Sequence, residues 1–578
     1  MSGGLIQLVN KGAQDQLVCG NPSFTHFRTV YKRHTDFAME QFELVFKTTN
    51  LRIPVSGSVT LRANVEQFSQ LVNDCYVVMT LPNIYSSVQP VNVSHPNLNN
   101  NSSAIGYEFQ WIRNIGYNMI NYASIVINGQ EIVRHTGEWM KLYADLNFDA
   151  NKKAMVDQMV GNVREMYDPG NAYDRTNQYP HAISTATALA EPSIYGRTLN
   201  VPLHFWFCED VGSALPLGAL QNSTVEIVVE LTNMYELFTI RDIRETINDL
   251  PNPNFGVRIA PDPSSPLMTM NNFLSPPTYG VAPVPTNPTL YYWVLNPFIE
   301  ANYIFLGDAE RIHLAKTENS FIINQVDMVT ADGQYGASND LLLLMRNLCT
   351  QVVWVAQRSD RVLQNDADNY TNWVDPYKAP INTTGMTGPA GVFNSGNALD
   401  TGVSQRDILL ESAIIIDGKE RFSYKQTYFF SQLENYRYQT GRTTTDIPGV
   451  YTYSFALDHH KKQPSGHING SMFNKIILRN SYVQPPFISI DTDPAQVAPV
   501  CVLKSSLNNP RPTIVNPNAV GPNGLPLYSP LDVITIVPSS QVANAVKTLP
   551  YNFTVRAYVE SYNFLRVMGG IANVVFSS

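Results

Sequence analysis

Short apolar runs, punctuated along the chain by Gly, Pro and Asn, recur and predict β-strands. Examples lie at residues 77–79, 125–127, 204–207, 225–231 and 450–457. Gly, Pro and Asn are typical turn residues and mark where strands end. Each run is also short enough to be a single strand. Many short strands with frequent turns indicate an all-β sandwich or barrel.

One segment departs from this pattern. Trp139, Leu142, Tyr143 and Leu146 follow an i, i+3, i+4, i+7 spacing, which places them on one face of a helix over residues 138–147. We expect this helix to pack on a sheet edge or under a loop. The polar stretches 90–103, 155–190, 251–288 and 364–404 are too long for hairpins and predict long loops at one end of the barrels.

Composition extends this picture to more than one domain. The 578 residues exceed the size at which a single core keeps growing, and 44% of them are hydrophobic while only 15% are charged. The formal charge of -9 argues against direct contact with nucleic acid, because neutralising phosphates needs concentrated Lys and Arg. We expect no direct nucleic-acid partner.

The cysteines predict reduced thiols. Five cysteines lie far apart without a C-x-x-C pair, at Cys19, Cys75, Cys208, Cys349 and Cys501. This spacing favours neither a disulfide framework nor a zinc site. The chain also lacks a signal-peptide apolar region and any apolar run of about 18 residues, so we expect neither secretion by that route nor integral membrane insertion.

Enzyme motifs are absent from the sequence. It contains no Walker phosphate loop, dinucleotide-binding glycine motif, H-E-x-x-H or G-x-S-x-G. His459-His460 is interpreted as part of a solvated loop rather than a metal site, and Asp366 with Asp368 as an ordinary surface loop, because later calcium-ligand positions hold unsuitable residues. We predict no catalytic residues, metal or cofactor.

The first forty-odd residues form a polar, turn-rich segment that cannot bury itself. A short apolar run at residues 5–9 is followed by a basic cluster, Arg28, Lys32 and Arg33, with His26 and His34 nearby. Two interpretations stay open. The cluster contacts an acidic partner or anionic lipid, or its charges pair with nearby Asp15, Asp36 and Glu40.

Several blocks in this order resemble the double jelly-roll major capsid proteins of nucleocytoplasmic large DNA viruses. They comprise Phe27-Arg28-Thr29-Val30-Tyr31-Lys32-Arg33-His34, Trp111-Ile112-Arg113-Asn114, Val201-Pro202-Leu203-His204-Phe205-Trp206-Phe207, Pro448-Gly449-Val450-Tyr451 and Tyr562-Asn563-Phe564-Leu565. The resemblance covers nearly the whole chain. It implies two consecutive eight-stranded jelly rolls with long loop insertions and a few short helices: an arm at 1–38, a first jelly roll at 39–306 containing the Pro-rich loop 251–288, and a second at 307–578.

The resemblance also implies the function. A structural major capsid protein forms homotrimers with a pseudo-hexameric outline, which tile an icosahedral virion shell after assembly in the host cytoplasm. Implied partners are further copies of the chain, minor capsid and penton proteins, and the inner viral membrane surface, reached through the arm. Alternatives are a minor capsid or spike protein of the same viruses, or a cupin- or lectin-like carbohydrate-binding jelly roll.

Two further expectations concern surface chemistry and duplication. N-glycosylation sequons are numerous, but an Asn-rich chain generates them by chance and we expect little occupancy. They lie at Asn92, Asn100, Asn101, Asn222, Asn369, Asn382, Asn469 and Asn552.

A duplicated fold should leave an internal repeat in the sequence, which we call an internal echo. Two internal echoes compete, one matching residues 303–306 with 562–565 and the other 222–230 with 552–560. We favour the first, because it pairs the closing strands of the two barrels.

Overall fold

The structure is a computed structural model of the whole chain. It describes residues 3–48, 52–86, 107–176, 178–242, 246–247, 250–251, 258–263, 268–278, 293–316, 318–373, 376, 406–441, 448–459, 463–485, 498–503, 531–536 and 551–576.

The first half of the chain folds into a barrel of two four-stranded antiparallel sheets. One has the order β1-β13-β3-β7 and the other β2-β8-β5-β6. Their bounds are β1 Phe37–Val45, β2 Val59–Asn64, β3 Leu71–Leu81, β5 Ile120–Ile127, β6 Gln130–Thr136, β7 Arg197–Pro202, β8 Val225–Leu231 and β13 Phe298–Leu306.

The second half repeats this arrangement. Its sheets contain the orders β14-β25-β16-β20 and β15-β22-β17-β18. The bounds are β14 Asn319–Gln334, β15 Asn339–Leu342, β16 Leu348–Arg358, β17 Leu409–Ile416, β18 Lys419–Glu420, β20 Val450–Ser454, β22 Ile476–Tyr482 and β25 Phe553–Met568. When these eight strands of each barrel are ranked along the chain, both barrels have the order 1-8-3-6 in one sheet and 2-7-4-5 in the other. The fold is therefore a double jelly roll.

This topology decides between the two internal echoes. β13 and β25 are the eighth of the ranked strands in their barrels, and each lies between the first and third ranked strands of its sheet. The favoured echo is confirmed at the level of strands, although Tyr303 lies in the first core and Tyr562 is absent from the second. The competing echo is wrong, because β8 occupies the position of β22 and not that of β25.

Local sequence explains a second repeated feature. Asn128-Gly129 joins β5 to β6, and Asp417-Gly418 joins β17 to β18. All four residues have positive φ, at 52°, 80°, 46° and 80° in chain order. Two consecutive positive φ angles make the turn whose twist matches antiparallel strands, and Asn-Gly and Asp-Gly favour it.

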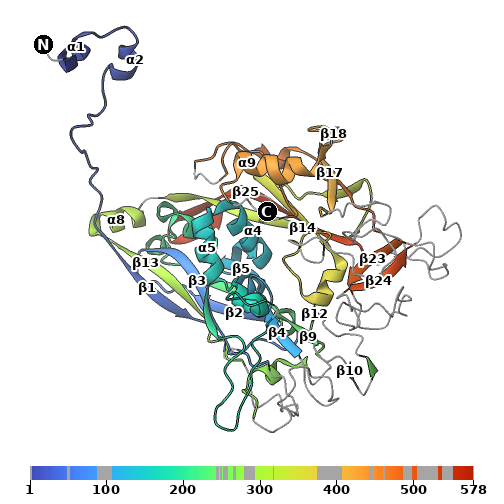
Figure 1. The fold of residues 1–578 in the computed structure, drawn as a ribbon. Helices are drawn as coiled ribbons and strands as arrows, with labels where there is room; N and C mark the ends of the chain where they lie inside the picture. The colour runs from blue at the N-terminus through green and yellow to red at the C-terminus, as the bar shows by residue number, and fades with distance from the viewer. Residues whose placement is uncertain are drawn as a thin grey trace.

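Helices and short strands decorate the two barrels (Figure 1). The α-helices are α1 Gly3–Val9, α2 Asp15–Cys19, α3 Ile115–Asn118, α4 Gly137–Asn147, α5 Ala150–Met159, α6 Arg164–Tyr167, α7 Trp206–Glu209, α8 Asp308–Lys316 and α9 Glu434–Tyr438. The 3-10 helices are η1 Pro169–Asn171, η2 Val211–Ser213, η3 Leu217–Ala219, η4 Met234–Glu236, η6 Met270–Phe273, η7 Ser359–Gln364 and η9 Gly470–Met472, while η8 Phe429–Leu433 is a π-helix. The remaining strands are β4 Tyr107–Trp111, β9 Phe238–Asp242, β10 Thr246–Ile247, β11 Leu250–Pro251, β12 Arg258–Ile259, β19 Lys425–Gln426, β21 Ile468–Asn469, β23 Ala498–Leu503, β24 Leu531–Ile536 and β26 Ile571–Val574.

The predicted helix is confirmed as α4. Thr136 caps its N-terminus, because the threonine hydroxyl accepts a hydrogen bond of 3.1 Å from the Trp139 amide. The strand predicted at 225–231 is β8 with the same bounds, whereas the strand predicted at 450–457 ends earlier, at Ser454.

Two local predictions are wrong. The run at 204–207 is not a strand, because β7 ends at Pro202 and α7 begins at Trp206. Pro202 ends β7, which is an edge strand where a missing amide donor is tolerated. The stretch 155–190 is not one long loop, since it contains the end of α5, then α6 and η1.

Candidate assembly surfaces

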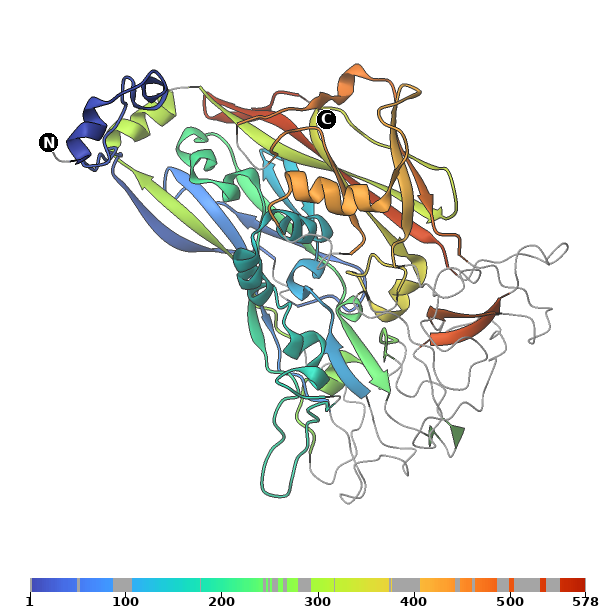
Figure 2. The ribbon, with the colours of Figure 1, turned by 45° about the horizontal axis from the view of Figure 1, so that its top comes forward.

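The N-terminal arm leaves the first barrel at β1 and projects away from the body (Figures 1 and 2). Every described residue from 8 to 36 is exposed. Large apolar side chains are among them, with Leu17 88% and Phe27 99% exposed. Apolar groups of this size favour burial, so the arm has the character of a segment that lies on a partner.

The three basic residues of the arm lie together on this exposed segment. Arg28, Lys32 and Arg33 form no ion pair with any residue that the structure describes. Asp15 instead accepts a hydrogen bond of 2.7 Å from the Gly12 amide. The geometry does not support the interpretation in which the arm's own acidic residues neutralise the cluster.

The helix α4 joins the two barrels. Figure 1 shows α4 and α5 between the two sets of sheets. The α4 side chains Trp139, Leu142 and Leu146 share one hydrophobic cluster with Val353, Val355 and Tyr558, which come from β16 and β25 of the second barrel. On its other face, Met140 and Ala144 belong to the core of the first barrel.

Glu138 is the polar centre of this junction. Its carboxylate accepts hydrogen bonds from the Arg556 guanidinium and from the hydroxyls of Tyr370, at 2.9 Å, and Tyr558. Burial raises the pKa of Glu138, but Arg556 and the hydrogen-bond donors outweigh burial and hold the pKa below its usual value. The glutamate is therefore an anion bound by the second barrel.

The loop after η7 makes a second contact between the barrels. Asp368 accepts hydrogen bonds from the side-chain amides of Asn114, at 2.6 Å, and Asn118, at 3.1 Å. Asn365 donates to the backbone carbonyls of Tyr235, at 2.6 Å, and Phe238, at 2.8 Å. The interpretation of this loop as an ordinary surface loop is wrong, because its polar groups bind the first barrel.

The sequons fall in different surroundings. Asn92, Asn100, Asn101 and Asn382 lie outside the described residues. Asn222 is exposed, and Asn469 and Asn552 are half-buried. The Asn369 side chain is fully buried, and its amide donates to Asp366 and to the Trp373 carbonyl at 3.0 Å each. Glycan occupancy stays an untested expectation.

Possible metal sites, histidines, thiols and membrane-spanning helices bear on the chemistry of the described part of the chain. No group of three or more His, Cys, Asp or Glu residues there could hold a metal ion. His459 is buried beside Gln439, so its interpretation as solvated is wrong, while His460 lies outside the described residues. Cys19, Cys75, Cys208 and Cys349 are free. No helix among the described residues is long and apolar enough to cross a membrane.

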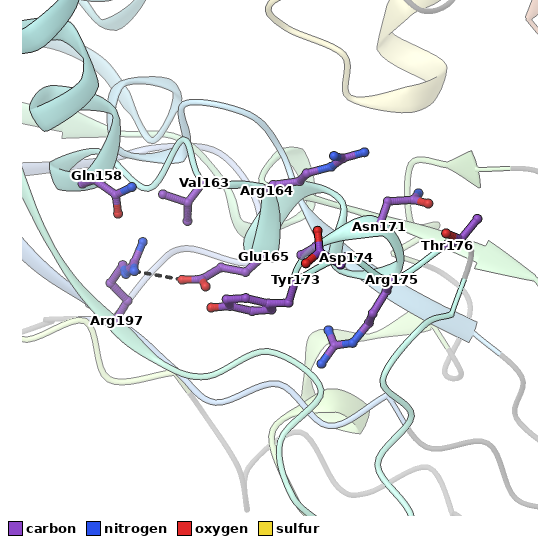
Figure 3. Close-up of a pocket in the computed structure, with 11 residues that line it drawn as sticks. Gln158, Val163, Arg164, Glu165, Asn171, Tyr173, Asp174, Arg175, Thr176 and Arg197 are labelled. Carbon is purple, nitrogen blue, oxygen red and sulfur yellow. Dashed lines mark ion pairs between the residues drawn. The ribbon is translucent and has the colours of Figure 1, made fainter.

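A cleft of about 690 Å³ lies beside α6 (Figure 3). Arg197 pairs with Glu165 at 2.8 Å, and Arg164 pairs with Asp168 at 3.4 Å. Each of these two arginines therefore has one acidic partner, while Arg175, which also lines the cleft, donates to the Pro169 carbonyl at 3.2 Å. We assign it no function.

Comparisons with known proteins agree with this architecture. A family model described as "Major capsid protein N-terminus" matches residues 25–267, and one described as "Large eukaryotic DNA virus major capsid protein" matches residues 310–492. The chain is 27% identical to a major capsid protein of Phaeocystis pouchetii virus, over 84% of this chain and 94% of that protein.

A more distant relative and two solved structures extend the similarity. The major capsid protein of Paramecium bursaria Chlorella virus 1 is 24% identical over the full length of both chains. A quasi-atomic model of the PBCV-1 virus capsid has a TM-score of 0.55 and 19% identity, covering 96% of this chain and 100% of that chain. The Faustovirus major capsid protein has a TM-score of 0.57 and 11% identity, covering 94% and 93%. The chain belongs to the double jelly-roll major capsid protein family of the nucleocytoplasmic large DNA viruses.

Proposed function

We propose that three copies of this chain associate into a capsomer with a pseudo-hexameric outline, and that such capsomers tile an icosahedral shell. The family places the chain in the virion shell as a structural protein. The observation that carries the finer proposal is the repeat of one strand order in two barrels of the same chain. Three such chains around a threefold axis supply six barrels, and a closed ring of them is a tile.

The same repeat supports the proposed domain boundaries. We place the arm at 1–38, the first jelly roll at 39–306 and the second at 307–578, although β1 of the first barrel already begins at Phe37. Sheet membership supports this division, because β1 to β13 pair among themselves and β14 to β26 do the same. β13 ends at Leu306, and α8 separates it from β14.

The arm contacts the components beneath the shell. Its full exposure and its unneutralised Arg28, Lys32 and Arg33 support contacts with minor capsid proteins and with the anionic surface of an inner membrane. Penton proteins and neighbouring capsomers are the remaining partners, and assembly takes place in the host cytoplasm. The role includes neither catalysis nor direct contact with the genome.

Mass and shape test this proposal. The full chain, purified in reducing buffer, is measured by light scattering and imaged by negative-stain electron microscopy. We expect a mass of three times 64.6 kDa and particles with a hexagonal outline. A chain that stays a compact monomer over the whole concentration range would contradict the proposal.

A further inference from the structure

Two cysteines that are far apart in the sequence meet in the first barrel. Cys75 lies on β3 and Cys208 on α7, and α7 packs against β3. The Cys208 sulfur is hydrogen-bonded to the Cys75 thiol and accepts a hydrogen bond from the Cys75 backbone amide. Both are free thiols in the structure. Because the Cβ atoms of a disulfide lie only about 4 Å apart, two thiols in contact have the arrangement from which a disulfide forms.

A β-bulge turns Cys75 towards the interior of the barrel. The pairing of β3 with β13 skips Asp74, whose φ is 48°. Val72 and Cys75 are three residues apart, yet both lie in the first core. An unbroken strand would place residues at this spacing on opposite faces of the sheet, and a bulge changes that alternation. The Cys75 side chain therefore points to the same core as Val72.

The turn after β7 brings Cys208 to the same place. The Leu203 amide donates to the Cys75 carbonyl at 2.9 Å, so the chain passes directly beside Cys75 before α7 begins. Phe205 and Phe207 are buried in the first core and hold α7 against it. Cys208 is half-buried and packs against that core. The backbone thus fixes both thiols beside each other.

The other cysteines with described side chains lie elsewhere. Cys19 is exposed on α2 of the arm. Cys349 lies on β16 in the second core, where its thiol donates to the Asn347 carbonyl at 3.4 Å. The contact between Cys75 and Cys208 is therefore a specific feature of the first barrel.

The reactivity of this pair depends on its surroundings. Burial raises the pKa of the Cys208 thiol well above its usual value, and the neighbouring Cys75 thiol raises it further. The thiolate is the reactive form, so oxidation at neutral pH is slow. Reducing agents of the cytosol keep such thiols reduced, whereas disulfides form and persist on virion surfaces. The family places this chain in the virion shell.

We propose that Cys75 and Cys208 form an intramolecular disulfide once the virion is in oxidising surroundings outside a cell. Two S–H bonds break and one S–S bond forms. Dissolved oxygen takes up the two electrons and the two protons and becomes hydrogen peroxide. The reaction takes place within one chain, so it does not depend on the proposed capsomer.

The bond would reinforce the first barrel. It closes the stretch of chain between residues 75 and 208, which contains β5, β6 and β7 as well as α4, the helix that joins the two barrels. A cross-link that closes a long loop restricts the unfolded chain more than one that closes a short loop. The oxidised chain is therefore more stable than the reduced chain.

Peptide mapping tests the bond directly. The full chain with Cys19→Ser, which removes an exposed thiol that could link two copies, is kept in mildly alkaline, air-saturated buffer or in reductant. Free thiols are then blocked, and the chain is digested and analysed by mass spectrometry. We expect most oxidised molecules to contain the Cys75 peptide linked to the Cys208 peptide, two hydrogens lighter than the separate peptides. The thermal midpoint should rise by roughly 5 °C or more over the reduced chain.

Two controls separate this pair from general oxidation. In the Cys19→Ser background, Cys208→Ala should leave Cys75 unlinked and make the thermal midpoint independent of oxidation. Oxidation in urea should spread the links over several cysteine pairs, because the fold no longer selects one.

The peptide map of the folded Cys19→Ser chain decides the outcome even if Cys208→Ala does not fold. The inference is wrong if Cys75 and Cys208 stay free under the oxidation that links cysteines in urea. It is also wrong if either cysteine is linked mainly to another cysteine, or is oxidised alone. Because the bond lies within one chain, these results hold for a monomer and a trimer alike, and they leave the proposed capsomer to its own test.

Discussion

Glu138 at the start of α4 and Arg556 of β25 form a two-pronged ion pair across the junction of the two barrels. Arg556 Nε lies 2.5 Å from one carboxylate oxygen and Arg556 Nη2 lies 2.7 Å from the other. The side chains are only 18% and 19% exposed. Because the helix belongs to the first barrel and the strand to the second, this pair fixes one barrel against the other.

Removal of the cation should destabilise the chain strongly. Arg556→Met leaves the Glu138 carboxylate largely desolvated without its partner, and we expect a loss of about 3 kcal/mol in the free energy of unfolding. Arg134→Met is the control, because Arg134 and Glu131 form an exposed pair at 2.8 Å, worth less than about 1 kcal/mol. Urea unfolding at neutral pH measures both, and equal losses would contradict the importance of the junction.

Two buried histidines should make the chain sensitive to acid. Burial lowers the pKa of His135 to about 4 and of His204 to about 3, from 6.5. The unfolded chain therefore binds protons below pH 6.5 that the folded chain does not. Stability is fully present above that pH and falls as the pH drops towards 4, by about 1.4 kcal/mol per pH unit for each histidine.

The variant His204→Gln isolates this effect. Glutamine does not titrate and can still hydrogen-bond the Tyr117 hydroxyl, which lies 3.0 Å from His204 Nε2. Unfolding curves between pH 4 and 7 should have a shallower pH dependence in the variant. An unchanged slope would show that His204 is not neutral in the folded chain.

Glu560 should act in the opposite direction. Burial raises its pKa to about 7 from 4.5, so the folded chain keeps a proton that the unfolded chain releases. Its contribution to stability is present below pH 4.5 and is lost as the pH rises to 7. Glu560→Gln should remove this loss, because glutamine mimics the protonated acid. A larger stability gain at pH 7 than at pH 5, measured by thermal unfolding, is the expected result.

The sequence predicted the parts of the fold that depend on local patterns. β8 and α4 follow from their apolar spacing, and the Asn128-Gly129 turn from the conformational freedom of its residues. The run at 204–207 failed because the same apolar composition fits a buried helix: Phe205 and Phe207 lie in the first core from α7 and the residues before it.

The junction between the barrels could not be predicted from the sequence. Glu138 and Arg556 are 418 residues apart, and no local pattern marks either as a partner of the other. The spacing of Asp366 and Asp368 matches only the first two ligands of a calcium loop. The contact of Asp368 with Asn114 depends on tertiary packing, which the local sequence does not encode. The internal echo related residues far apart in the sequence. It matched equivalent strands of the two barrels, but it gave no information on the helix and side chains that join the barrels.

The arm should contribute little to the stability of the barrels. Residues 8–36 are exposed, so deletion of residues 1–36 removes no packed core. We expect the thermal midpoint of the purified chain to change by less than about 2 °C, since surface changes away from packed features are usually small. Limited proteolysis should also cleave the arm first. A large drop in the midpoint would mean that the arm folds back onto the barrels.

Two glycines with similar backbone conformations should tolerate substitution differently. Gly449 and Gly418 have φ of +84° and +80°, so alanine pays a similar backbone cost at both, about 1 kcal/mol. A Cβ at Gly449 would lie 2.1 Å from the Tyr370 carbonyl oxygen, whereas a Cβ at Gly418 would meet nothing within 4 Å. Gly449→Ala must therefore displace Tyr370, whose hydroxyl binds Glu138.

We expect Gly449→Ala to cost about 3 kcal/mol or more and Gly418→Ala about 1 kcal/mol, measured by urea unfolding. The difference isolates the close approach of Gly449 to Tyr370, because the backbone term cancels between the two variants. Gly449→Ala should also weaken the effect of Arg556→Met in the double variant, since residues that share one network are not additive. If the stability losses of Gly449→Ala and Arg556→Met simply add in the double variant, Gly449 does not belong to the junction. If Gly449→Ala costs no more stability than Gly418→Ala, the close contact between Gly449 and Tyr370 is wrong.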